Sequence, residues 1–201
     1  MLLALDTSTR FASIALYDGE GVQGEHTWRV DQNHTEDLMP RVVSLMAAAH
    51  VAPAALTGIA VALGPGSFNG LRVAMSVAKG LALALKIPLV GFSTLEALAY
   101  QHGSLSLPVR PILESGGSEL ATSLYKVARN HWTQMEEPHL ASVDEICAAT
   151  TQRTRRRIRR SGKAIERPGR RARTARQRAV WILALDELLA ERACRTERAD
   201  D

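Results

Sequence analysis

The chain has 201 residues, 46% of them hydrophobic, which suits one compact domain or two small lobes around a buried core. No apolar run approaches the roughly 18 residues of a membrane span, and the N-terminus lacks the basic region and apolar length of a signal peptide. Two widely separated cysteines match no metal-site spacing and favour free thiols, so we expect a soluble cytoplasmic protein without membrane contact.

The net charge of +4 hides a division along the chain. Residues 1–150 hold 9 basic and 14 acidic residues, a net charge of −5, whereas residues 151–201 hold 16 and 7, a net charge of +9. The basic character therefore belongs to the C-terminal part, and the body of the protein is mildly acidic.

The N-terminal part predicts an antiparallel meander. Residues 2–6 form an apolar run that ends at a carboxylate, and residues 12–18 alternate as a second strand. The DGEG sequence at 18–21 is a hairpin signal, with residues 22–30 as the third strand.

A helix is predicted next, starting around residues 35–37. Asn33 and Glu36 have the spacing of a capping box, and Pro40 is tolerated only near the first turn. Seven residues recur at helical spacing as an apolar face: Leu38, Met39, Val42, Val43, Leu45, Met46 and Ala49.

Strands and helices then alternate. We expect strands over 57–63 and 87–92, and helices over 70–85 and 93–101, the last capped by Ser93. Further on, strands over 107–115 and 119–127 flank a glycine turn at Gly116–Gly117, a third strand covers 131–135, and a helix capped by Ser142 covers 142–150. This order predicts a mixed α/β sheet with packed helices.

The stretch GPGSFNGLR, residues 64–72, resembles a phosphate-binding loop but matches neither the Walker nor the dinucleotide spacing. We favour a helix entry that lets the helix approach the sheet, capped by Ser67 or Asn69. The alternative is an anion or nucleotide loop formed by Asp6, Gly64, Gly66, Ser67, Asn69, Gly70 and Arg72. Likewise, Asp6 is interpreted as a turn cap bonded to Thr7 and Ser8 rather than as a metal or phosphate ligand.

No catalytic constellation is found. The six histidines form no zinc-type pair, and no nucleophile elbow is present, so we predict no catalytic and no metal-binding residue in this chain. The helix over 70–85 is apolar nearly all round, which leaves two interpretations open: it is buried centrally, or a partner covers it.

Five stretches resemble the bacterial TsaB (YeaZ) family: LLALDTST, NHTEDLMP, GPGSFNGLRVAMSVAKGLALAL, IPLVGFSTLEALA and PVRPILESGGSELATSLYKV. The resemblance covers residues 2–152, and Asn69 stands where the family usually has threonine. It implies an actin-like ATPase (ribonuclease H-like) α/β fold, with a mixed sheet and packed helices.

The resemblance also implies a non-catalytic role. Such proteins pair with a TsaD-like catalytic subunit and work with a TsaE-like ATPase on adenosine 37 of tRNA, so no cofactor is expected in this chain, and ATP and metal are expected in the partner subunits. Homodimerisation is an alternative. The interface implied for the two helices comprises Leu38, Met39, Val42, Leu45, Met46, Leu71, Met75, Ala78, Leu81 and Ala82.

The tail departs from the family. We divide the chain into an N-terminal actin-like lobe (1–105), the start of a truncated or aberrant second lobe (106–152) and an atypical tail (153–201). Residues 153–178 carry 12 arginines and one lysine against one acid, which fits either a shifted reading frame or an RNA-attracting segment.

Three functions thus remain in competition. The first is the accessory subunit for tRNA threonylcarbamoyladenosine formation. The others are an actin-like ATPase or kinase that uses Asp6 and the Gly64–Gly70 loop, and an RNA-binding protein that acts through the basic tail.

Overall fold

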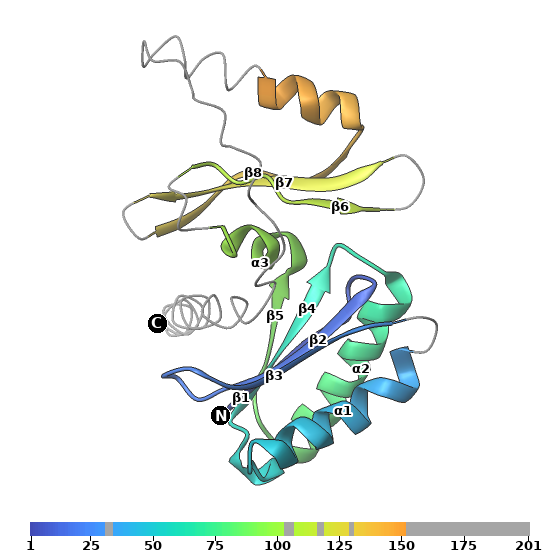
Figure 1. Cartoon of the computed structure of the whole chain (residues 1–201), viewed down its shortest axis with the longest axis vertical. Helices are drawn as coiled ribbons and strands as arrows, with labels where there is room; N and C mark the ends of the chain where they lie inside the picture. Colours follow the sequence, from blue (N-terminus) through green and yellow to red (C-terminus); the bar gives the residue numbers. More distant parts are fainter. Residues whose placement is uncertain (31–33, 103–106, 116–118, 129–130, 152–201) are drawn as a thin grey trace, which may run out of the picture.

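The computed structural model describes residues 1–30, 34–102, 107–115, 119–128 and 131–151, which form two sheets and the helices around them (Figure 1). In chain order the elements are β1 (Leu2–Asp6), β2 (Phe11–Tyr17), β3 (Val22–Arg29), α1 (His34–Ala48), a short 3₁₀ helix (Pro53–Ala55), β4 (Gly58–Gly64), α2 (Phe68–Leu85), β5 (Leu89–Ser93), α3 (Thr94–Tyr100), β6 (Ile112–Glu114), β7 (Leu120–Ala128) and β8 (His131–Ala141). Residues 143–151 form a last helix.

The first sheet has the strand order β3-β2-β1-β4-β5. The predicted meander of β1, β2 and β3 is antiparallel, and β4 and β5 add in parallel to β1. The hairpin turn is held by Asp18, whose Oδ1 accepts hydrogen bonds of 2.9 Å from the N–H groups of Glu20 and Gly21. This confirms the turn expected at 18–21 and the mixed α/β fold.

Helices α1 and α2 cover one face of this sheet (Figure 1). Leu3 and Leu5 of β1 point into the core between sheet and helices, and neither is exposed. Helix α2 turns a row of small residues to the sheet: Gly70, Ala74, Ala78 and Ala82. Because these side chains are so short, the helix can lie close to the strands.

The length of α2 corrects one expectation. By length and composition alone it meets the criterion for a membrane-spanning helix, contrary to the prediction that no segment does. In this fold, however, its alanine row packs against β-strands, and the charged Arg72 and Lys79 interrupt its exposed side. Only the side that carries Gly70, Ala74, Ala78 and Ala82 belongs to the core of the first lobe.

Helix α3 lies between the two sheets (Figure 1). Leu95 and Ala99 of α3 are buried with Tyr125 of β7 in one apolar cluster. The ring of Trp132 stacks on that of Tyr125 with a centroid distance of 5.6 Å, which extends the cluster across the second sheet. As predicted, Ser93 caps α3 by accepting a hydrogen bond from the N–H of Glu96.

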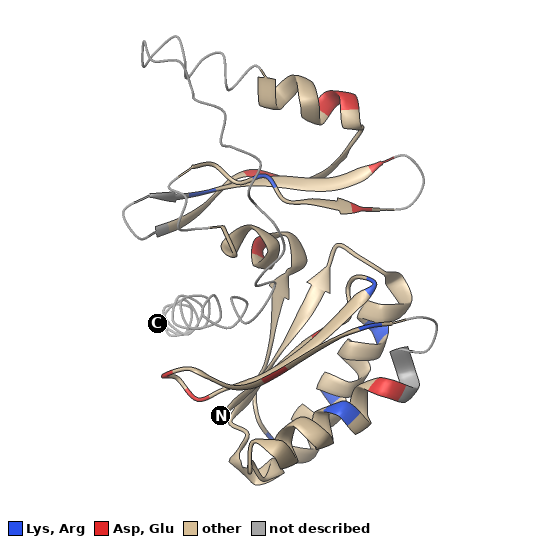
Figure 2. Ribbon diagram, viewed as in Figure 1, with Lys and Arg blue, Asp and Glu red and all other residues tan. Residues whose placement is uncertain are grey.

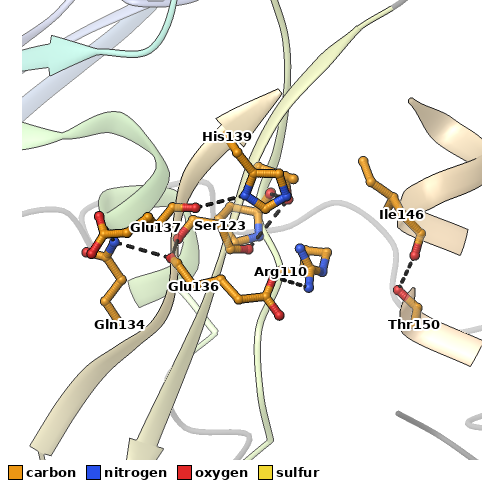
Figure 3. Close-up of polar contacts among 10 residues, drawn as sticks. Arg110, Ser123, Gln134, Glu136, Glu137, His139, Ile146 and Thr150 are labelled. Carbon is orange, nitrogen blue, oxygen red and sulfur yellow. Dashed lines mark hydrogen bonds and ion pairs between the residues drawn. The ribbon is translucent and has the colours of Figure 1, made fainter. Parts of the chain in front are cut away.

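The second sheet has the order β6-β7-β8 and is antiparallel throughout. Its register shifts near Ser123, where polar contacts gather (Figure 3). The Ser123 hydroxyl donates to the Glu136 carbonyl at 2.6 Å, and the Glu136 carboxylate pairs with Arg110 at 2.5 Å. These contacts fix an irregular strand pair.

The last helix begins as expected. Ser142 Oγ accepts from the N–H of Glu145 at 3.3 Å, and the Glu145 carboxylate accepts from the N–H of Ser142 at 2.8 Å. This reciprocal capping box confirms Ser142 as the N-cap.

The predicted start of α1 needs a small correction, and other predictions lie outside the described residues. Helix α1 begins at His34, slightly before the expected start, so Pro40 lies in its second turn rather than its first. The Asn33 cap, the Gly116–Gly117 turn and the whole tail from residue 153 lie outside the described residues. The division into parts at residues 105 and 152 stays a prediction.

The end of α2 yields a stability prediction. Lys86 adopts a left-handed conformation, φ 54°, while its N–H bonds to the Ala82 and Leu83 carbonyls. Since glycine enters this region without the strain of a side chain, Lys86→Gly should raise the free energy of unfolding by about 1 kcal/mol in urea denaturation. The matched variant Lys79→Gly, inside the helix, should instead lower it by about 1 kcal/mol. Equal effects of the two variants would contradict the argument.

Candidate functional site

The turn after β1 and the glycine loop after β4 meet at the carboxyl edge of the first sheet, because β1 and β4 are parallel neighbours. The N–H of Ser67 donates to the Ser8 carbonyl at 2.7 Å. The Thr7 hydroxyl donates to the Gly70 carbonyl at 2.6 Å, a buried contact across 63 positions of sequence. The loop is therefore bonded to the turn on both sides of the α2 start.

Gly66 lies against this turn with no room for a side chain. A Cβ atom at position 66 would stand 2.3 Å from the Ser8 carbonyl oxygen, and φ of Gly66 is +158°. Gly64 has a φ of +107°, and the Gly64–Pro65 peptide bond is cis. The space next to Gly66 is thus filled by the protein's own backbone, which supports the close-packed helix entry over a phosphate cradle.

Asp6 ends β1 in a buried position, with 3% of its surface exposed. Its carboxylate accepts a 2.7 Å hydrogen bond from the N–H of Ser8. Burial raises the pKa of Asp6 to about 6, although hydrogen bonding by Ser8 opposes the rise. The turn-cap interpretation is confirmed for Ser8, whereas the hydroxyl of Thr7 bonds elsewhere.

The start of α2 resolves the choice of cap. Ser67, not Asn69, caps the helix, with its Oγ accepting from the N–H of Gly70 at 3.2 Å. Asn69 and Arg72 are exposed, and the Arg72 guanidinium lies 5.2 Å from the centroid of the Phe68 ring. The seven residues of the alternative anion loop thus differ in exposure: Asp6 and Gly70 are buried, Gly64 and Gly66 are half-buried, and Ser67, Asn69 and Arg72 are exposed.

The helix pair α1–α2 corrects half of the predicted interface. Five of its ten residues are buried in this chain's own core and cannot be reached by a partner: Leu38, Val42, Met46, Ala78 and Ala82. The other five are half-buried, and all but Met39 pack at the rim of an apolar cluster: Met39, Leu45, Leu71, Met75 and Leu81. Helical periodicity identified an apolar face, but that face covers the sheet.

The exposed apolar residues of this helix pair are others. Val43 of α1 is 58% exposed, and Phe68 and Leu83 of α2 are 72% and 81% exposed. The coloured parts of both helices carry few charges (Figure 2). A helical wheel centred on the alanine row would have placed Phe68 and Leu83 on the far side, so this signal was available in the sequence. These three residues are the candidate contact surface.

Within the described part of the chain, no group of three or more histidine, cysteine, aspartate or glutamate side chains is placed to hold a metal ion. The polar features of the first lobe's edge are those of a fixed turn and a capped helix.

Comparison with known proteins places this fold. The family model for "TsaD: tRNA N6-adenosine threonylcarbamoyltransferase" matches residues 20–175. The TsaB protein of Bacillus subtilis is 37% identical over 125 residues, which are 62% of this chain and 55% of that protein. For Escherichia coli TsaB the identity is 34% over 98 residues, or 49% and 42% of the two chains. This chain thus spans about half the length of the curated relatives it matches.

A solved structure agrees with these sequence relatives. YeaZ from Pseudomonas aeruginosa superposes with a TM-score of 0.65 at 31% identity, covering 70% of this chain and 67% of that one. The chain therefore carries the domain that the family model describes and belongs to the TsaB (YeaZ) family.

Proposed function

We propose that this protein is a non-catalytic subunit in the formation of threonylcarbamoyladenosine at position 37 of tRNA. The observation that carries the proposal is the match to relatives named "tRNA threonylcarbamoyladenosine biosynthesis protein TsaB", at 37% identity over 125 residues and 34% over 98 residues. In this role the chain pairs with a TsaD-type catalytic subunit, and the tight packing at Asp6 and Gly66 serves the fold rather than a reaction.

The pairing surface is the exposed side of α1 and α2. Val43, Phe68 and Leu83 are large apolar side chains that remain mostly exposed on two helices packed against each other. Burying such side chains on association removes apolar surface from water, which favours a stable complex. The half-buried Met39 and Met75 would flank this contact.

The remaining parts of the system lie in other chains. ATP and metal chemistry belongs to the TsaD-type and TsaE-type subunits, and tRNA reaches this protein through the complex. The proposal places the chain as a soluble protein of the cytoplasm. A homodimer through the same helices is the form expected without the partner.

Co-purification with the TsaD-type protein encoded in the same genome tests the pairing. Val43→Asp and Leu83→Asp should each weaken the complex by about 2 kcal/mol or more, because each buries an unpaired carboxylate at the contact. Titration calorimetry measures the loss. These positions are exposed, so the variants should fold. A charge at the half-buried Met75 or Leu81 would also disturb the packing of this chain's own core.

Leu140→Asp is the matched control, since Leu140 is an exposed apolar residue of the second sheet, 52% accessible. Its complex should have wild-type affinity. Unchanged affinity in both helix variants would exclude this surface. Tight ATP binding with turnover by the isolated chain would instead favour an ATPase or kinase. Salt-sensitive tRNA binding that is lost on removal of residues 153–201 would favour an RNA-binding protein that acts through its basic tail.

A further inference from the structure

Strand β3 and helix α1 bring three side chains together at the edge of the first sheet. His26 and Trp28 lie on the same face of β3, with ring centroids 5.3 Å apart and planes inclined by 24°. The Arg41 guanidinium lies over Trp28, 4.7 Å from the ring centroid. Its Nη1 is 2.6 Å from His26 Nε2, so the imidazole nitrogen accepts, since a guanidinium can only donate.

This cluster holds two buried N–H donors that have no hydrogen-bond partner among the described residues. Trp28 is 9% exposed, and its Nε1 has no hydrogen-bond partner among the residues that the structure describes. The same holds for Arg41 Nε, which is also buried. Unsatisfied buried N–H groups are costly and uncommon, and here two of them belong to side chains in direct contact.

The charge of the cluster shows which kind of group is missing. Arg41 is half-buried and permanently charged, yet no carboxylate in the described part of the chain lies within ion-pair distance of it. The guanidinium of Arg41 lies over the Trp28 ring, and this ring accepts no hydrogen bond from Arg41 Nε. Two donors without an acceptor in the described ranges, beside a guanidinium that has no carboxylate partner there, fit an acceptor with negative charge.

We propose that Trp28 and Arg41 form a binding site for a single oxyanionic group, either a carboxylate or a phosphate, which accepts hydrogen bonds from Trp28 Nε1 and Arg41 Nε. Neighbouring His26 positions the guanidinium through its own Nε2. The site is independent of the proposed role in tRNA modification, because it depends on neither a partner subunit nor the exposed face of Val43, Phe68 and Leu83.

Trp132 provides an internal comparison. Its Nε1 is likewise buried without a partner among the described residues, but its neighbours are the rings of Tyr100 and Tyr125 rather than an arginine. An anion should therefore affect the indole of Trp28 and not that of Trp132. The two signals can be assigned with Trp28→Phe and Trp132→Phe.

The test is a titration of the ¹⁵N-labelled full chain with inorganic phosphate and, separately, with acetate, followed by the indole N–H signals in NMR. Sodium chloride at matched ionic strength is the reference. We expect a saturable shift of the Trp28 signal with at least one of the two anions, and the more effective anion identifies the class of ligand. Arg41→Gln should weaken that binding by about tenfold or more, because it removes both charge and donors.

Lys79→Gln, which removes an exposed cation of α2, should leave the titration unchanged. If Arg41→Gln does not fold, Arg41→Lys and Trp28→Phe replace it in the test, because each retains much of the packing but loses one of the two donors. Binding to Trp28→Phe is measured by calorimetry with the more effective anion. The proposal is overturned if neither anion gives a saturable shift. It is equally overturned if chloride or Trp132 responds to the same extent, or if binding survives in the folded Arg41 variants.

Discussion

Replacing Gly66 with alanine is expected to lower the free energy of unfolding by about 3 kcal/mol or more. The added Cβ would stand 2.3 Å from the Ser8 carbonyl oxygen and 2.8 Å from the Ser8 Cβ. The first of these is a backbone atom, so it cannot turn aside as a flexible side chain would. The loop must instead move away from the β1 turn, which stretches the 2.7 Å hydrogen bond from Ser67 N–H to Ser8 and disturbs the α2 cap.

Gly80→Ala is the matched control, because position 80 lies inside α2 with no atom within 4 Å of the new Cβ. That variant should gain about 1 kcal/mol from the higher helix propensity of alanine. Urea denaturation followed by circular dichroism measures both changes at neutral pH. If the two glycines tolerated alanine equally well, the close approach of loop and turn would not be the reason for glycine at 66.

The order of elements was predictable because it depends on local patterns. The bounds of β1 follow from an apolar run that ends at a carboxylate, and the start of β3 follows from the hairpin signal before it. The caps Ser93 and Ser142 follow from capping-box spacing. Each of these signals spans only a few residues. They could therefore be identified without knowing what the segment packs against.

The candidate contact surface could be predicted only in part. Periodicity placed Leu38 and Val42 on one side of α1, but it does not say whether that side meets this chain's own sheet or another protein. In α2 the ambiguity is greater because nearly every position is apolar. The row of small residues shows which side of α2 faces the sheet, since only small side chains allow a close helix-to-sheet contact. These residues are Gly70, Ala74, Ala78 and Ala82.

The contacts that shape the sites connect distant parts of the chain. Gly66 meets Ser8 although three strands, α1 and a 3₁₀ helix lie between them in the sequence, and Arg41 meets Trp28 from a different element. Sequence spacing carries no information on such pairs without an alignment of homologues. The glycine loop could be recognised as a helix entry, but the reason for its second glycine needed the fold.

Asp6→Asn is expected to stabilise the protein at neutral pH and to remove part of its pH dependence. The pKa of Asp6 rises from 3.8 to about 6 in the folded state, mainly because burial disfavours the charged form. Between these two values the folded chain holds a proton that the unfolded chain releases, so stability falls as pH rises through this window. Above pH 6 the ionised Asp6 costs about 3 kcal/mol relative to low pH, from about two pKa units at 1.36 kcal/mol each.

Asparagine is neutral at every pH and can still accept the Ser8 N–H through its side-chain oxygen. The free energy of unfolding of the variant should therefore equal or fall below that of wild type near pH 4 and exceed it increasingly up to pH 7, as urea denaturation at a series of pH values would reveal.

Asp18→Asn should change the pH dependence of stability in the opposite direction, because the N–H groups of Gly21 and Glu20 lower the pKa of the exposed Asp18. There the variant should be the less stable protein at neutral pH, with the difference shrinking as the solution becomes acidic. A difference between Asp6→Asn and wild type that stays constant from pH 4 to pH 7 would show that the buried carboxyl group does not titrate in this range.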